Sequence, residues 1–128
     1  MSRREARETA FKLIFEYSFS KQENKDLFEE YTAGISGDES SYISEVYFGV
    51  ISHYDELEKL VAETAEKFEV KRLYKVDFAL IMLALYEIKY MSSIPFKVSV
   101  DEALDLASKY STEKSVKYIN GVLSKFVR

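Results

Sequence analysis

Apolar residues recur every three or four positions along almost the whole chain, a spacing that places them on one face of an α-helix. No pair of strand-like segments joined by a hairpin turn signal interrupts this spacing. The pattern therefore predicts an all-α fold, a compact bundle of about six to seven helices. The predicted helices cover residues 3–20, 25–33, 40–68 and 70–90, then one that begins at Ser99 and a last one that begins at Ser111 or Thr112.

Two of these helices differ in how much of their surface is apolar. The stretch 40–68 has the longest regular pattern and is expected to form one amphipathic helix, with an acidic face in solvent. In the helix that ends at Tyr90, nearly every residue from Phe78 to Tyr86 is apolar. That helix is therefore expected at the centre of the bundle, buried on all sides.

Several residues indicate where helices begin and end. Gly34 suits the left-handed conformation that closes a helix, and Gly37 is expected in the loop after it. The segment that contains Pro95 ends the central helix. Ser99 and Glu102 have the spacing of a capping box, in which each side chain accepts a hydrogen bond from the other's backbone N–H, so Ser99 is expected to cap the next helix.

Composition narrows the class of protein. At 128 residues the chain is most simply a single domain over residues 1–128. It has no cysteine, which excludes disulfides, thiolate metal sites and cysteine nucleophiles. Its densest apolar run is shorter than the ~20 residues that a membrane span needs. These features predict a soluble cytoplasmic protein that does not enter a membrane.

Residues for catalysis are scarce. His53 is the only histidine and lies on an amphipathic helix, where a structural or surface role is expected. The chain has no glycine-rich phosphate loop and no histidine–carboxylate helix motif for a metal. The sequence therefore predicts a protein that is not an enzyme and that carries no cofactor or metal.

Positive charge is concentrated at the two ends of an acidic chain. The formal net charge is −4, yet residues 1–12 carry +2 and residues 109–128 carry +4, which leaves −10 between them. If the fold brings the ends together, they form one cationic surface on an acidic body, which suits a polyanion such as a nucleic acid.

The residues at these ends also suit a nucleic acid. Arginine offers a planar fork for phosphates and base edges, and Arg3, Arg4 and Arg7 lie at the start of the first helix or on the tail before it. Phe15 could stack on an unpaired base if it is exposed, and it could equally belong to the core. The last helix could extend the surface through Lys114, Lys117 and Lys125. Because flanking basic residues have little to bury, Arg3 and Arg4 are expected to be frayed until RNA binds.

Asp77 stands at the entrance of the apolar run. It could be an N-cap or a first-turn anion that the helix dipole favours. Alternatively, it could contact a partner protein.

Three segments carry motifs that occur together in one known family. Residues 3–10 read RREARETA, and residues 72–77 read RLYKVD and lead into LALYEI. Residues 94–98 read IPFKV and are followed by DEA and then by KYINGVL at 117–123, which is the most specific combination. In this order and spacing, the chain resembles the bacterial transcription antitermination factor NusB family over nearly its whole length.

The resemblance implies an all-helical fold of two packed helical subdomains and a cytoplasmic RNA-binding protein without catalysis. It also implies that the protein pairs with ribosomal protein S10, called NusE in this role, and that the pair recognises the single-stranded boxA element of nascent RNA. With other Nus factors, the pair modifies RNA polymerase against premature termination, notably on ribosomal RNA operons. Members of the family can also form homodimers that hide the RNA surface.

Carried over by position, the resemblance assigns residues to two surfaces. The residues implied in RNA binding are Arg3, Arg4, Arg7, Phe15, Lys114, Lys117, Tyr118 and Asn120. Those implied to face S10 are Asp77 and its neighbours Phe78 and Ile81. Three positions depart from the family pattern: Phe15 where many members have Tyr, Phe68 where a Trp is often found, and Lys114 where some carry Asp.

Two other functions fit the residues. One is a helical protein-interaction adaptor without RNA affinity, which would not need the arginine segment, so it would keep its partner when Arg3, Arg4 and Arg7 are replaced by alanine. The other is a stand-alone RNA-binding module related to that of rRNA cytosine methyltransferases. Such a module would share the fold. It could act only as a stand-alone piece, because 128 residues leave no space for a cofactor-binding half.

Overall fold

The computed structural model describes residues 1–67 and 73–127, and every regular element in these ranges is helical. The elements are α1 (Arg3–Ser20), α2 (Lys25–Thr32), α3 (Gly37–Ser52), α4 (Tyr54–Lys67), α5 (Lys75–Tyr90), α6 (Phe96–Tyr110), α7 (Glu113–Leu123) and a 3₁₀ turn, η1 (Ser124–Phe126). The predicted all-α fold is confirmed. The predicted helix end at Phe68 and helix start at Val70 lie outside the described residues. Within the described ranges, no helix is both long and apolar enough to cross a membrane.

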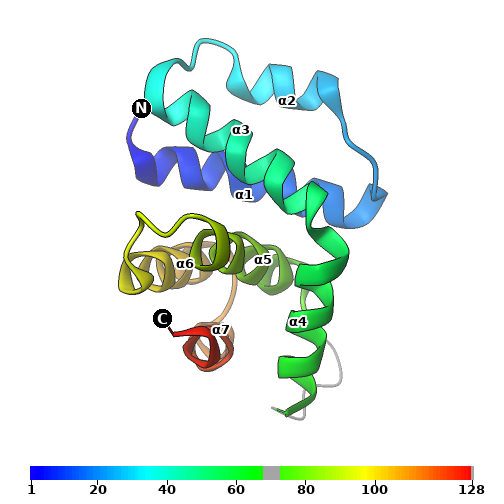
Figure 1. Ribbon diagram of the computed structural model, residues 1–128, viewed down its shortest axis with the longest axis vertical. Helices are drawn as coiled ribbons and strands as arrows, with labels where there is room; N and C mark the ends of the chain where they lie inside the picture. Colours follow the sequence, from blue (N-terminus) through cyan, green and yellow to red (C-terminus); the bar gives the residue numbers. More distant parts are fainter. Residues whose placement is uncertain (68–72, 128) are drawn as a thin grey trace.

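The central helix of the bundle is α5. Figure 1 shows α1, α2 and α3 together on one side of it, while α4, α6 and α7 surround its other sides. Every side chain from Ala79 to Leu85 is at most 2% exposed, because all of these helices except α2 pack against α5. The all-round burial predicted from the apolar run is therefore confirmed, and the two groups of helices match the two packed subdomains that the family resemblance implies.

The single helix predicted over residues 40–68 is wrong, because the chain bends at His53. This residue has φ −110° and ψ 19°, and its N–H donates to the Gly49 carbonyl at 3.0 Å before the chain turns into α4 (Figure 1). The turn directs α4 against α5, and Leu57 of α4 is fully buried. A bend at one residue barely changes the spacing of apolar positions, so the periodicity continues across it. At the other end, Gly37 is the first residue of α3, with φ +67°, and not part of the loop.

The start of α6 also differs from the prediction. The helix begins at Phe96, directly after Pro95, whose carbonyl accepts hydrogen bonds from the N–H groups of Val98 and Ser99 at 3.0 and 3.2 Å. Ser99 therefore lies inside the first turn, 2% exposed, and its hydroxyl donates to Glu87 at 2.8 Å. The predicted capping box between Ser99 and Glu102 is wrong, since both side chains face charged groups of other helices.

Candidate nucleic-acid interface

The first helix begins at Arg3 and is capped at once. Ser2 Oγ accepts a hydrogen bond from the Glu5 N–H at 3.1 Å, and the Ser2 N–H donates to Glu5 Oε1 at 3.0 Å. This capping box satisfies two backbone donors at the helix start, and the hydrogen bond from the Ser2 backbone lowers the pKa of Glu5. Arg3 and Arg4 are thus helical in the free protein, and the prediction that they are frayed before RNA binds is wrong.

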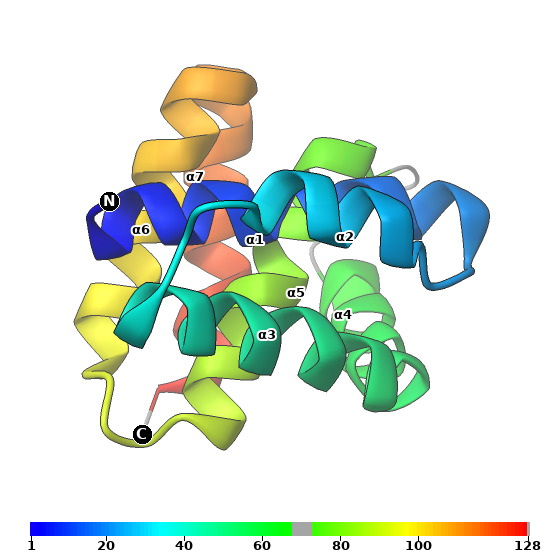
Figure 2. The same ribbon diagram turned by 90° about the horizontal axis from the view of Figure 1, so that it is seen from above.

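Arg4 is the most exposed of the three N-terminal arginines and pairs with α6. Its Nε lies 3.1 Å from Glu102 Oε2, and its Nη2 lies 3.0 Å from Asp105 Oδ2. The Arg4 side chain remains 65% exposed, because both contacts are at the surface. Arg3 is half-buried, with its guanidinium carbon 4.6 Å from the centre of the Tyr42 ring. Figure 2 shows the start of α1 lying over α6, where these pairs form.

Arg7 lies inside the bundle, 4% exposed. Its Nε donates to Glu87 Oε2 at 2.8 Å, and its Nη2 donates to Glu87 Oε1 at 3.3 Å. Burial opposes the charged form of Arg7, but the hydrogen bond and charge of Glu87 outweigh it and raise the pKa of Arg7. This side chain therefore does not share the surface of Arg3 and Arg4, although the sequence groups the three together.

Glu87 is the centre of a buried polar network that joins α1, α3, α5 and α6. Besides Arg7, it binds the hydroxyl of Tyr42 and the hydroxyl of Ser99, both of which donate to its carboxylate. Burial, together with the charge of Glu87, holds the pKa of Tyr42 well above its usual value, so the phenol keeps its proton. Glu102 lies 3.8 Å from Arg7 Nη1 and extends the network towards the surface. The sequence does not predict this network, and the one signal for it is a lone carboxylate, Glu87, directly after the apolar run.

Phe15 lies half-buried between two other phenylalanines of α1. Its ring centre is 6.1 Å from that of Phe11 and 5.0 Å from that of Phe19. Phe11 is 3% exposed and also packs on Tyr110 at the end of α6, with ring centres 5.3 Å apart. Part of the Phe15 ring therefore stays in solvent, where an unpaired base can reach it.

Three of the four α7 residues implied in RNA binding are exposed: Lys114, Lys117 and Asn120. The fourth, Tyr118, is half-buried, and burial together with the charge of Asp77 raises the pKa of its hydroxyl. The predicted start of this helix is confirmed, because Thr112 Oγ1 accepts a hydrogen bond from the Ser115 N–H at 3.0 Å.

The fold brings the start of α1 next to the end of α6. Lys109 Nζ lies 2.6 Å from Glu8 Oε2, and this hydrogen bond lowers the pKa of Glu8 and raises that of Lys109. Arg4, Arg7 and Lys109 thus each lie beside an acidic partner. The net positive charge offered by this region is therefore smaller than the charge of the two chain ends suggests.

Asp77 anchors the start of α5 to the start of α7. It lies in the first turn of α5, 3% exposed, and accepts hydrogen bonds from the hydroxyls of Ser111 at 2.7 Å and Ser115 at 2.6 Å. Its first-turn position agrees with one of the two roles considered from the sequence. Ile81 is fully buried, and Phe78 is half-buried. Of the three residues implied to face S10, two are buried, and Phe78 is the one whose side chain reaches solvent.

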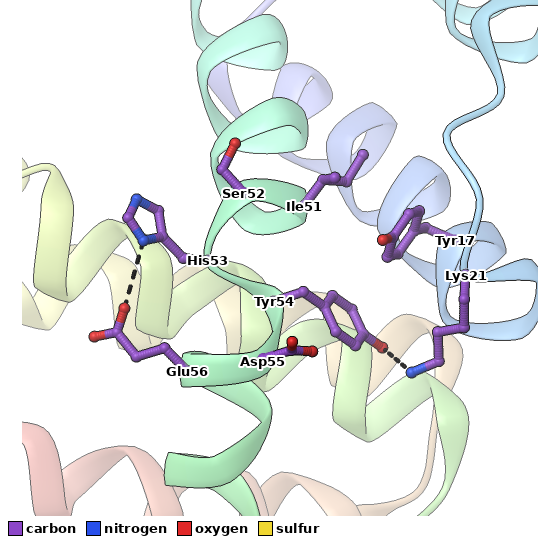
Figure 3. Close-up of a pocket in the computed structure, with 8 residues that line it drawn as sticks. All are labelled: Tyr17, Lys21, Ile51, Ser52, His53, Tyr54, Asp55 and Glu56. Atoms are coloured by element: carbon purple, nitrogen blue, oxygen red, sulfur yellow. Dashed lines mark hydrogen bonds and ion pairs between the residues drawn. The ribbon is translucent and has the colours of Figure 1, made fainter.

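A separate hollow of about 550 Å³ lies where the end of α1 meets the junction of α3 and α4 (Figure 3). It is lined by Tyr17, Lys21, Ile51, Ser52, His53, Tyr54, Asp55 and Glu56. Lys21 Nζ donates to the Tyr54 hydroxyl at 3.0 Å, and His53 Nδ1 lies 3.4 Å from Glu56 Oε2. None of the residues implied in RNA or S10 binding lines the hollow. Within the described residues, no cluster of three or more His, Cys, Asp or Glu side chains could hold a metal ion.

Glu56 beside this hollow makes a pH-dependent contribution to stability. Hydrogen bonds from Tyr90 and Lys89 lower the pKa of Glu56 to about 2. Because an unfolded Glu titrates near ~4.3, the stabilisation is complete above that pH and is lost as the pH falls towards the folded value. We expect Glu56→Gln to lower the urea midpoint at pH 7, and we expect its difference from the parent protein to shrink as the pH falls through about 2. A midpoint difference that stays constant over this range would contradict the assignment, and Glu63→Gln on the same exposed helix side is the matched control.

Comparison with known proteins gives one family. The sequence matches the NusB family over residues 4–128. It is 38% identical, over 130 residues, to a transcription antitermination protein NusB from Agathobacter rectalis, with 98% of this chain and 99% of the relative covered. The NusB protein of Geobacillus kaustophilus is 37% identical over 125 residues, with 98% and 95% covered.

Solved structures show the same fold. T. maritima NusB has a TM-score of 0.82 at 30% identity, with 98% of this chain and 90% of that chain covered. A crystal structure of antitermination factors NusB and NusE in complex with dsRNA has a TM-score of 0.83 at 24% identity, with 98% and 97% covered. The second structure is similar in fold.

Proposed function

This chain belongs to the NusB family, and on that basis we propose that it is a transcription antitermination factor that binds boxA-type single-stranded RNA together with ribosomal protein S10. In this role it supports processive transcription of ribosomal RNA operons, with other Nus factors and RNA polymerase, in the cytoplasm and without catalysis of its own. The observation that carries the proposal is the family match over residues 4–128.

In this proposal, the RNA lies across α1 and α7. The side chains that suit direct contact are exposed or half-exposed: Arg3, Arg4, Phe15, Lys114, Lys117, Tyr118 and Asn120. Cations bind phosphates, and an aromatic ring can stack on an unpaired base. Arg7 acts differently, because its bonds to Glu87 hold α1 against α5 from inside. It therefore positions the helix that carries Arg3 and Arg4.

The S10 surface is proposed at the start of α5. Phe78 offers part of its ring there, while the buried side chains Asp77 and Ile81 fix the backbone that presents it. Support comes from the solved complex of similar fold, which contains NusB together with NusE. That complex also contains dsRNA, so the test compares single-stranded with double-stranded RNA directly.

The test is the affinity for a fluorescent boxA-like RNA, with and without S10, over a salt series. We expect selective binding of the single strand over a scrambled strand and over its duplex, and tighter binding with S10. Replacing Arg3 and Arg4 by alanine should weaken binding and reduce its salt dependence. Lys59→Ala, which removes an exposed lysine from α4, is the matched control. Equal binding of all three RNAs would contradict boxA recognition, and S10 binding without any RNA binding would favour the adaptor without RNA affinity.

The acidic partners of Arg4 are expected to compete with RNA for its guanidinium. Asp105 and Glu102 occupy the donors that a phosphate would use. Exposed ion pairs contribute roughly 0–1 kcal/mol, so Asp105→Asn should raise the RNA affinity by up to about fivefold. Asp101→Asn is the matched control, since that residue pairs with Lys97 at 2.9 Å on the same helix. An equal gain in both variants would show a general charge effect. No gain in Asp105→Asn would show that Asp105 does not compete with RNA for Arg4.

A further inference from the structure

We propose that Phe19 and Lys75 extend the RNA-binding surface beyond Phe15 and hold one further unpaired nucleotide. The base would stack on the Phe19 ring, and the phosphate would pair with the Lys75 ammonium. This inference rests on the proposed RNA-binding function, and it adds a subsite formed by the end of α1 and the start of α5.

The first support is the arrangement of aromatic rings along α1. Phe11, Phe15 and Phe19 are spaced four residues apart, so they lie on the same side of the helix. Their exposure rises along the helix, from 3% at Phe11, through half-buried Phe15, to 60% at Phe19. The Phe15 and Phe19 rings are in contact, with centres 5.0 Å apart and planes at 80°. A strand that stacks on Phe15 therefore finds the next exposed ring directly beside it.

The second support is a lysine at that ring. Lys75 Nζ lies 5.4 Å from the centre of the Phe19 ring and donates to the Ser18 carbonyl at 3.3 Å. The ammonium is therefore held near the last turn of α1, on an exposed residue of α5. A surface that combines a ring with an adjacent cation suits a single strand, since every unpaired nucleotide offers a flat base and a phosphate.

Two features favour RNA over a protein at this subsite: the positive charge of Lys75, and the direct contact between the Phe19 ring and the Phe15 ring. A protein segment would need an acidic or apolar match of its own, whereas the RNA proposed for Phe15 continues onto Phe19 without a gap. A purely structural role is the remaining alternative, in which Lys75 caps α1 and packs on Phe19. That role predicts a change in stability and no change in RNA binding.

The experiment compares a core boxA-like RNA with versions that carry three extra unpaired nucleotides on the 5′ or the 3′ side. Binding is measured with S10 present, for the parent protein and for Phe19→Ala, Phe19→Trp and Lys75→Gln. We expect one extended RNA to bind the parent protein about tenfold more tightly than the core RNA, which is the typical size of one base–aromatic stack. Phe19→Ala should lose this gain but keep the core affinity, and Phe19→Trp should retain it. Lys75→Gln should reduce the salt slope for the extended RNA by about one.

Several results would overturn the subsite. One is an extended RNA that gains as much affinity over the core RNA with Phe19→Ala as with the parent protein. Another is a parent protein that binds the core RNA selectively but binds neither extended RNA more tightly. In both cases the proposed function stands and the subsite does not. Weaker S10 binding by Phe19→Ala, with unchanged RNA affinity, would assign the ring to the protein partner. If the core RNA itself shows no selective binding, the proposed function fails and the subsite with it.

Discussion

Replacing Arg7 by alanine is expected to lower the free energy of unfolding by about 3–5 kcal/mol, as the loss of one partner of a buried ion pair does. The reason is that Glu87, fully buried, would lose the charge and the two N–H donors that now face it. Small domains are stable by only ~5–15 kcal/mol, so this is a large share of the total. Urea denaturation followed by circular dichroism measures the effect.

Two further variants identify the origin of this loss. Adding Glu87→Gln to Arg7→Ala removes the unpaired charge and should recover part of the stability. Arg4→Ala breaks only exposed ion pairs and should lower the free energy of unfolding by less than about 1 kcal/mol. A loss of under 1 kcal/mol for Arg7→Ala would mean that this arginine is not buried. RNA affinity should fall in Arg7→Ala only to the extent that the protein unfolds or α1 shifts.

Replacing Asp77 by alanine is expected to have the second largest effect, about 1.5–3 kcal/mol. Its carboxylate accepts hydrogen bonds from Ser111 and Ser115, and removal would leave both hydroxyls without this partner at the junction of α5 and α7. Asp77→Asn keeps one carbonyl oxygen and should cost less. The measurement is again the urea midpoint, together with the affinity for S10.

The two roles considered for Asp77 predict different patterns. If it acts as an internal anchor, the loss of S10 affinity follows the loss of stability across the alanine and asparagine variants. Ser115→Ala, which removes one donor on the other side of the same contact, should then resemble Asp77→Asn. Unchanged stability with a large loss of S10 binding would instead make Asp77 a direct partner contact.

Periodicity predicts the helices of this protein well, because each one packs apolar side chains against the rest of the bundle. The apolar run of α5 predicts its central place, since a helix without a polar face has to be surrounded. The bend at His53 escapes prediction because the stripe continues across a single non-helical residue. The predicted start of α6 is wrong for another reason. Ser99 and Glu102 have the spacing of a local cap, but contacts with other helices decide their positions: Ser99 binds Glu87, and Glu102 pairs with Arg4 and Arg7.

The candidate site could be predicted only in part from the sequence. Composition and order favour an arginine-rich RNA surface, but they do not distinguish Arg7 from Arg3 and Arg4. The distinction depends on Glu87, which lies 80 residues away and meets Arg7 only in the folded bundle. Likewise, the charge of the chain ends overestimates the cationic surface, because Glu102 and Asp105, which lie outside the two ends in sequence, pair with Arg4 in the folded protein.

The most direct test of the central claim is transcription through a terminator in vitro, on templates with an intact or a scrambled boxA element. The reaction contains RNA polymerase, S10 and the other Nus factors, with and without this protein. We predict that adding the protein raises read-through on the boxA template only, and that the Arg3/Arg4→Ala variant does so less. Read-through that is unchanged by the protein, while S10 still binds it, would contradict an antitermination function.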